Sequence, residues 1–263
     1  MRRFVAVLIM CALCLVAPIP TAGADFADRI AAADEYLATR PGTVGYVVRD
    51  RTTGAAHRNE AAGTLIWTAS TIKLAMVVDL LTRATAGQIS MTDEDRQLMV
   101  DMLRSSDSDA ADTLWKKFGG TDHMAFNRNF PSYGLTGLQP QQGYGEVYPD
   151  WGFQKATADD LDRLMNYVLG RMPAAQTAAI VAEMQQVSAN QRWGVWGAGR
   201  DMSPGNKNGW SPEEGGWVVN SVGFAGPGQQ YTLAIMNALE GEGGFEDGVE
   251  TTTRLAEILL SPE

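Results

Sequence analysis

The sequence predicts a mixed α/β (α+β) fold, in which an antiparallel sheet with flanking helices is built from both chain ends and a separate lobe is all helical. Strand-like segments occur at residues 43–60 and again at 216–239. Helical spacing dominates the chain between them, and one helical segment lies at each end. The two sets of strands can share one core if they pair into a single sheet, with the central helices forming their own lobe.

The predicted boundaries divide the chain into three parts. Residues 1–24 are predicted to be a signal peptide. Residues 25–67 and 195–263 form the sheet part, and residues 68–194 form the helical part. Together the last two make one domain, with a site in the cleft between them, where pockets commonly occur.

The N-terminus has the pattern of a secretory signal peptide. Two arginines precede an apolar run at residues 4–19, and Ala22-Gly23-Ala24 offers a small-residue cleavage site. The alternative, a transmembrane anchor, is disfavoured because prolines interrupt the run and it is short for a span of roughly 20 residues. We therefore expect a secreted, periplasmic or cell-envelope protein with no stable membrane span after cleavage.

Composition excludes several kinds of site. Both cysteines, Cys11 and Cys14, lie in the signal segment, so the mature chain has no disulfide, thiolate metal site or cysteine nucleophile. Met10 and Leu13 are poor residues before a lipid-modified cysteine, which disfavours a lipid anchor. The net charge of −10 becomes more negative once the signal is removed, and this does not suit a phosphate backbone. No nucleic-acid partner, metal or cofactor is expected.

Each helix and strand has a local signal. Thr92 and Thr157 are expected N-caps, and acidic residues follow both. Gly119-Gly120 and Gly170 are expected helix ends. Gly226-Pro227-Gly228 predicts a hairpin turn between two strands. Helices are predicted at residues 25–37, 68–81, 92–106, 109–118, 157–170, 173–187 and 245–260, and strands at 43–60, 216–225 and 230–239.

Residues 131–155 show no clear period and are predicted to form a long loop, which in compact domains is often functional. Its aromatic residues either line the cleft or attach the loop to the core, and the second reading is the more common one. They are Tyr144, Tyr148, Trp151 and Phe153.

Ser70 and Lys73 stand at the start of the helix predicted from Thr68 or Ala69. Residues three apart share a helix face, so the amine of Lys73 can reach the hydroxyl of Ser70 and take its proton. Alone this is weak, because roughly one Ser-x-x-Lys arises by chance per 250 residues. A helix cap beside a lysine that extends to solvent is the ordinary explanation of the isolated pair.

Two further motifs strengthen the case. Ser106-Asp107-Ser108 stands at a junction between helices, and Lys207-Asn208-Gly209 leads into the C-terminal strands. The trio S-x-x-K, S-D-N and K-T-G occurs in this order in class A β-lactamases and penicillin-binding proteins. Lys117-Phe118-Gly119 also matches Lys-x-Gly, but it ends a helix and is interpreted as a C-cap.

Over nearly its whole mature length the chain resembles the class A β-lactamase and penicillin-recognising serine hydrolase superfamily. The resemblance implies a sheet domain plus a helical domain and acyl transfer through an acyl-enzyme. It implies that Ser70 is the nucleophile, Lys73 its base and Ser106 a proton relay to the leaving amine. Lys207 would supply positive potential for a substrate carboxylate and lower the pKa of Lys73.

The resemblance also implies a set of substrate contacts. Ser108 takes the place of the family's Asn, and Asn208 that of its Thr or Ser beside the substrate carboxylate. Gly209 would let the strand approach the ligand. The backbone N–H groups of Ser70 and Trp210 would form the oxyanion hole, at about 3 kcal/mol per donor. Asp107 is expected to fix its loop by accepting backbone N–H groups.

Efficient class A enzymes hydrolyse the acyl-enzyme with a Glu–Pro in the long loop. If Gln139-Pro140 takes that place, the base is an amide and general-base help of about 10²–10⁴-fold is lost. Glu146 and Asp150 are the other acids of the loop, and each is read as a solvated charge. Slow deacylation is therefore expected.

The sequence thus predicts one catalytic domain of an exported serine hydrolase. Its substrate would be either a small molecule of the β-lactam class or a cell-wall peptide. In the second case the bond cleaved would be a D-Ala-D-Ala-like amide or a related ester. The alternative is a non-catalytic ligand- or peptidoglycan-binding module that keeps the fold. We expect a monomer.

Overall fold

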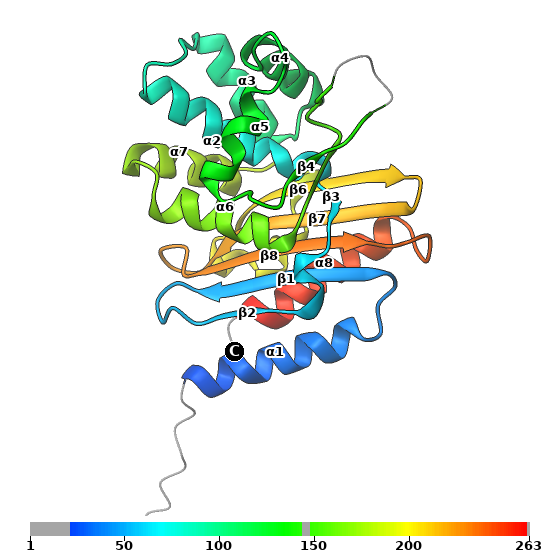
Figure 1. The fold of residues 1–263 in the computed structure, drawn as a ribbon. Coiled ribbons are helices and arrows are strands. Elements are labelled where there is room, and N and C mark those ends of the chain that lie inside the picture. The colour runs from blue at the N-terminus through cyan, green and yellow to red at the C-terminus, as the bar shows by residue number, and fades with distance from the viewer. Residues whose placement is uncertain (1–21, 144–147, 262–263) are drawn as a thin grey trace, which may run out of the picture.

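The computed structural model describes residues 22–143 and 148–261. Five strands form an antiparallel sheet in the order β2-β1-β8-β7-β6 (Figure 1). The two chain ends meet in its middle, where β1 pairs with β8 from Thr43↔Ala238 to Asp50↔Tyr231. The predicted antiparallel sheet built from both ends of the chain is therefore confirmed. The strands are β1 (Thr43–Asp50), β2 (Ala56–Arg58), β6 (Gly205–Glu213), β7 (Gly216–Ala225) and β8 (Tyr231–Ala238).

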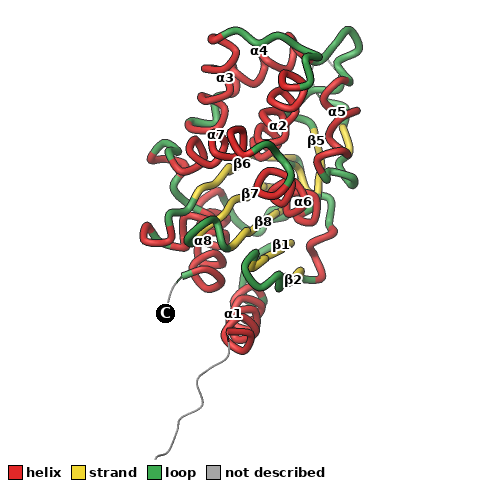
Figure 2. Tube along the Cα trace, turned by 90° about the vertical axis from the view of Figure 1, so that its left-hand side faces the viewer, coloured by secondary structure: helices red, strands yellow, loops and turns green. Residues whose placement is uncertain are grey.

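Helices cover both faces of the sheet. α1 (Ala22–Leu37) and α8 (Phe245–Leu260) lie on one face, and α6 (Ala158–Gly170) lies on the other (Figure 2). Along β8, Leu233 and Ile235 pack toward α8. Met236 instead joins the core shared with the helical part. This alternation follows from the period of two along a strand, and each fully buried aliphatic side chain contributes about 1.5–3 kcal/mol.

The helical part is organised around α2 (Ile72–Thr85), whose residues 72–80 are all buried. Trp115 of α4 stacks on Phe126 of α5 with ring centroids 4.7 Å apart, which fills the centre of this lobe. The other helices of the lobe are α3 (Asp93–Arg104), α4 (Ser108–Phe118), α5 (Ala125–Asn129) and α7 (Ala174–Gln185).

The predicted caps are confirmed. The hydroxyl of Thr92 accepts the N–H of Asp95, and the same box of reciprocal bonds occurs at Thr157. Asp107 is the N-cap of α4 and accepts the N–H of Ala110 at 2.8 Å, so it fixes its loop as expected. Gly119 is the C-cap of α4, as the interpretation of its Lys-x-Gly motif required.

Two local predictions were wrong. The helix expected from Thr68 or Ala69 begins as a 3₁₀ turn, η2 (Ala69–Thr71), and becomes α-helical only at Ile72. The long loop contains parts of a small sheet of order β3-β5-β4. Its strands are two or three residues long, too short to give a period. They are β3 (Ile66–Trp67), β4 (Gln139–Pro140) and β5 (Gln154–Ala156).

Short 3₁₀ turns connect the remaining segments, and they fall mostly where the chain passes between the sheet and the helical part. They are η1 (Glu60–Gly63), η3 (Phe130–Tyr133), η4 (Ala189–Gln191), η5 (Gly194–Ala198) and η6 (Arg200–Met202).

The predicted signal peptide lies outside the described residues up to residue 21, and α1 begins at Ala22. Within the described part of the chain, the helices are too short or too polar to cross a bilayer. The domain boundaries at residues 67/68 and 194/195 stay a prediction.

Candidate active site

Ser70 lies in η2, directly before α2. Ala69, which precedes it, has a φ of +44°, a left-handed conformation that residues other than glycine rarely adopt and that is often found at active sites. Asn220 of β7 donates its side-chain amide to the carbonyl oxygens of Trp67 (2.8 Å) and Thr68 (3.3 Å). The sheet thus holds the backbone that presents Ser70.

Lys73 follows one turn later and its side chain is fully buried. Its Nζ donates to the carbonyl oxygen of Ser106 at 2.6 Å and to Oγ of Ser108 at 3.1 Å. It also lies 4.4 Å from the centre of the Trp151 ring. In the described structure no hydrogen bond joins this amine to the Ser70 hydroxyl. Hydrogen bonds between catalytic groups are often long or poorly aligned in proteins without a bound substrate.

Burial lowers the pKa of Lys73 to about 8, although the carboxylates of Asp107 and Asp112 act in the opposite direction. Desolvation disfavours the charged form of an amine, which is why the shift is downward. A lysine with a pKa in this range is neutral for part of the time near neutral pH. It can therefore accept a proton, which an ordinary lysine cannot do there.

Lys207 enters the same place from β6 and is also buried. Its Nζ donates to Oγ of Ser106 at 2.8 Å and to the carbonyl oxygen of Asn208 at 2.7 Å. Burial, and then the positive charge of Lys73, hold the pKa of Lys207 well below its usual range. Neither lysine is in an ion pair within residues 22–143 and 148–261. Two buried amines without a carboxylate partner are typical of a functional site.

Ser106 connects the two lysines. Its φ is +63°, again left-handed, and in this conformation its carbonyl oxygen faces Lys73 while its hydroxyl faces Lys207. Because the hydroxyl oxygen accepts from Lys207, its own proton is available to a third group. The structure therefore brings Lys73, Ser106, Ser108 and Lys207 together.

Gly209 places the edge strand β6 directly against the nucleophile segment. A Cβ at this position would lie 2.7 Å from the backbone nitrogens of both Ser70 and Thr71. The predicted role of Gly209 was a close approach to a ligand. What lies against it here is the backbone of residues 70 and 71, so its absent side chain serves packing within the site.

Trp210 follows on the same edge strand. The carbonyl oxygen of Asn208 accepts a hydrogen bond from Lys207 Nζ, which is a side-chain group and not part of the sheet. Because the N–H and C=O groups of alternate residues in a strand point the same way, we expect the N–H of Trp210 to point, like that carbonyl, to the free edge of the sheet. The ring of Trp210 packs on Trp193 and Phe245, with centroids 5.8 Å and 5.6 Å away.

We expect replacement of Gly209 by alanine to push β6 away from Ser70. The new methyl group meets backbone, which cannot move aside, so we expect a loss of about 1–3 kcal/mol in the free energy of unfolding. Thermal denaturation, together with covalent labelling of Ser70, measures both consequences. Gly215→Ala is the matched control, because its Cβ would meet nothing within 4 Å. Equal melting temperatures for the two variants would contradict the packing role.

Asn208 does not fit the predicted contact with a substrate. Its side-chain nitrogen donates to the carbonyls of Gln191 (2.9 Å) and Trp193 (3.3 Å). Its side-chain oxygen accepts from Asn206 and from Ser221, each at 2.7 Å. The side chain is 1% exposed and points away from Lys207, because neighbouring residues of a strand face opposite sides.

The residue of the long loop that reaches Lys73 is Trp151, and sequence reasoning favoured a merely structural role for it. Its Nε1 donates to Asp112 of α4 at 2.6 Å. Gln139 is exposed in β4 and does not contact Lys73, so it does not take the place suggested for it. Asp150 is half-buried, which raises its pKa, and it accepts the N–H of Gly152. Glu146 lies outside the described residues.

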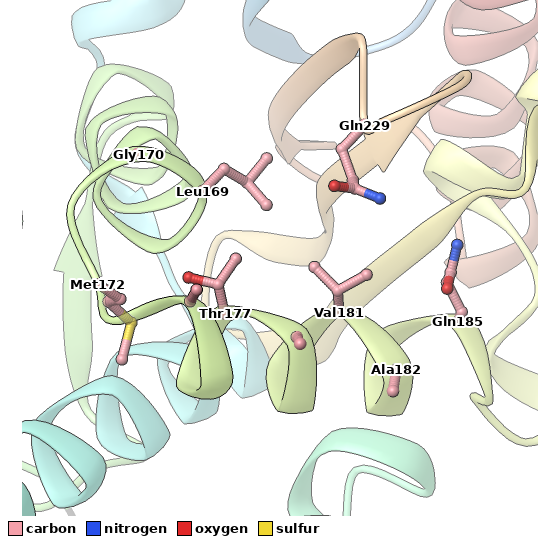
Figure 3. A pocket seen from close by; sticks show the side chains of 10 residues that line it. Leu169, Gly170, Met172, Thr177, Val181, Ala182, Gln185 and Gln229 are labelled. Atoms are coloured by element: carbon pink, nitrogen blue, oxygen red, sulfur yellow. The ribbon is translucent and has the colours of Figure 1, made fainter.

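A separate groove of about 490 Å³ lies between the end of α6, α7 and the β7–β8 turn (Figure 3). Val181 of α7 and Gln229 of the turn point toward the space between them. None of the predicted site residues lines it. In the part of the chain that the structure describes, there is also no cluster of histidine, cysteine and acidic residues that could hold a metal ion.

Comparison with known proteins gives relatives in sequence and in structure. No protein-family model matches the chain. It is 29% identical over 217 residues to proteins named putative lipoprotein LppW from Mycobacterium tuberculosis and Mycobacterium bovis, covering 79% of this chain and 67% of theirs.

Solved structures of β-lactamases resemble it over most of their length. A β-lactamase from Xanthomonas campestris has a TM-score of 0.72 at 16% identity, covering 90% of this chain and 97% of that one. A β-lactamase from Streptosporangium roseum has a TM-score of 0.71 at 16% identity, covering 89% and 97%. A variant of the last common ancestor of the class A enzymes of Gram-negative bacteria has a TM-score of 0.70 at 17% identity, covering 88% and 97%. The chain therefore has the class A β-lactamase fold, of which it is a divergent example.

Proposed function

We propose that this protein is an exported serine hydrolase that forms an acyl-ester on Ser70 and releases it slowly. Its substrate would be a β-lactam or a D-Ala-D-Ala-like amide or related ester. The observation that carries the proposal is the placement of two buried amines, Lys73 and Lys207, on either side of Ser106 and close to the segment that presents Ser70. The fold shared with named β-lactamases supports the same class of substrate.

The proposed acylation uses these groups in turn. Oγ of Ser70 attacks the carbonyl carbon and its proton passes to neutral Lys73. The carbonyl oxygen becomes an oxyanion, which the N–H groups of Ser70 and Trp210 stabilise by about 3 kcal/mol each. The C–N bond then breaks, the leaving nitrogen takes the proton of the Ser106 hydroxyl, and the ammonium group of Lys207 returns a proton to that oxygen across 2.8 Å.

Lys207 gives the site its positive potential. Burial holds the pKa of Lys207 well below its usual range, and an anionic group of a substrate beside it would favour the ammonium form, so such a group finds its complement here. Ser108 is an exposed residue whose Oγ accepts from Lys73, and its one hydroxyl donor would be offered to an amide carbonyl of the substrate. Asn208 is left out of the proposed substrate contacts.

The proposed location is the cell envelope or outside it. The predicted signal peptide supports export, and the sequence relatives named putative lipoproteins support the envelope.

A non-catalytic binding module is the second candidate. The observation that favours it is the missing hydrogen bond between the Ser70 hydroxyl and the Lys73 amine within the described residues. Intact-mass measurement after incubation with benzylpenicillin separates the two. An adduct of one penicillin per chain supports the hydrolase, and binding without an adduct supports the module.

We expect the rate of acylation to rise with pH through about pH 8, the pKa to which burial lowers Lys73. The sign follows from the base role: below this pH the amine is protonated, so the rate should fall by roughly tenfold per pH unit. The measurement is the second-order rate constant of adduct formation between about pH 6 and about pH 9. A rate that is flat over this range would contradict proton transfer to Lys73.

A further inference from the structure

The indole of Trp151 stands between a buried lysine and a carboxylate. One face of the ring lies 4.4 Å from Nζ of Lys73. Its N–H donates to Asp112 at 2.6 Å. Asp112 belongs to α4, whereas Trp151 belongs to the long loop, so the contact attaches the loop to the helical lobe at the site itself.

This contact completes the surroundings of the Lys73 amine. An ammonium group has three N–H donors. Two of them meet the carbonyl of Ser106 and the hydroxyl of Ser108, and the face of Trp151 is placed to receive the third. The electron-rich face of an indole attracts a cation, and a carboxylate bound to the indole N–H strengthens that attraction.

No described oxygen of the long loop takes this place instead. Asp150, the neighbouring acid, accepts the N–H of Gly152 at 2.8 Å. An indole face cannot accept a proton from water, and its bulk occupies the space beside the amine.

We propose that Trp151, held by Asp112, is a positioning residue that fixes the Lys73 amine and keeps water from it, so that the Ser70 ester is hydrolysed slowly. The inference rests on the proposed function, and it names the residue that sets the lifetime of the acyl-enzyme. Hydrolysis requires water to attack the ester carbonyl carbon and lose a proton to a base. The bond from that carbon to Oγ of Ser70 then breaks, Oγ takes a proton, and a carboxylic acid leaves. Trp151 restricts the first of these steps.

The test compares Trp151→Ala with the conservative Trp151→Phe, which keeps a ring over Lys73. The mature protein is acylated with benzylpenicillin, excess drug is removed, and the decay of the adduct is followed by intact mass. Loss of a cation–π contact alone corresponds to roughly 2- to 30-fold. We expect the adduct of Trp151→Ala to decay roughly tenfold faster than that of the wild type, and that of Trp151→Phe to stay within about threefold of it.

A second readout does not depend on acylation. Acetic anhydride modifies accessible neutral amines, and peptide mass spectrometry gives the modification of Lys73 relative to the exposed Lys116 of the same chain. We expect roughly tenfold more labelling of Lys73 in Trp151→Ala and little change in Trp151→Phe. If benzylpenicillin acylates no variant, the proposed function fails, and the labelling series alone decides this inference.

Trp196→Phe is the matched control. Trp196 also stacks on a cation, with Arg192 5.1 Å from its ring, but it lies in η5, apart from Lys73. Neither readout should change in this variant. If circular dichroism shows that Trp151→Ala is unfolded, Asp112→Asn replaces it, with faster labelling of Lys73 expected. Equal labelling of Lys73 in the wild type and the variant, or an adduct lifetime that does not shorten, would overturn the proposal.

Discussion

Replacement of Ser70 by alanine is expected to abolish the covalent adduct with benzylpenicillin. The proposed chemistry needs an oxygen nucleophile between η2 and the edge of β6, where Gly209 lies against the backbone of Ser70. No other side chain can supply that oxygen from the same place, so the rate of adduct formation should fall by roughly 10⁴-fold or more. Intact-mass kinetics measures the change directly.

Ser70→Ala should still bind benzylpenicillin although it cannot form the covalent adduct. The amine of Lys207 stays in place when the hydroxyl of Ser70 is removed, because its partners are Ser106 and Asn208. Calorimetric titration should therefore still detect the drug. Ser132→Ala, at an exposed serine of η3, is the control and should be acylated like the wild type. An adduct of unchanged yield on Ser70→Ala would refute Ser70 as the nucleophile.

Replacement of Lys73 is expected to have the second largest effect. Lys73→Met removes the base and should slow acylation by about 10²–10⁴-fold. It also leaves the carbonyl of Ser106 without its 2.6 Å partner, at a cost of about 1–3 kcal/mol. Stopped-flow or quenched-flow labelling gives the rate, and chemical denaturation gives the stability.

A second substitution distinguishes the role of Lys73 as a proton acceptor from its role as a positive charge. Lys73→Arg keeps a cation but cannot become neutral, so it should be as slow as Lys73→Met if proton transfer is the role of Lys73. Lys155→Met is the control, because Lys155 also lies over an indole, 4.6 Å from the Trp67 ring, but in the small sheet. Activity of Lys73→Arg close to that of the wild type would show that positive charge is sufficient.

Elements with strong local signals could be predicted from the sequence. α8 spans Phe245–Leu260 and β7 spans Gly216–Ala225, as expected from their apolar periods. The start of α2 was misplaced because the backbone before the 3₁₀ turn that presents Ser70 is held by the side chain of Asn220 on a distant strand. Tertiary contacts of this kind leave no mark in local periodicity.

The motifs predicted which side chains of the site lie close together, but they did not predict the direction in which the side chain of Asn208 points. The motifs placed Ser106 and Lys207 in one site, and the structure brings them within 2.8 Å. Asn208 was assigned to the substrate, although it adjoins Lys207 in a strand and so must face the other side. Alternation along the strand was enough to detect this error. Trp151 gave no comparable signal, because an aromatic residue in a loop is most often there for packing.

The pairing of β1 with β8 also constrains how the molecule is made. The partner of β1 is β8, so β1 cannot form this pairing until residues 231–238 have left the ribosome. Until then β1 has only the short β2 as a neighbour, and a two-stranded hairpin is at best marginally stable in water. The nascent chain therefore cannot pair β1 with β8 until that later segment has emerged.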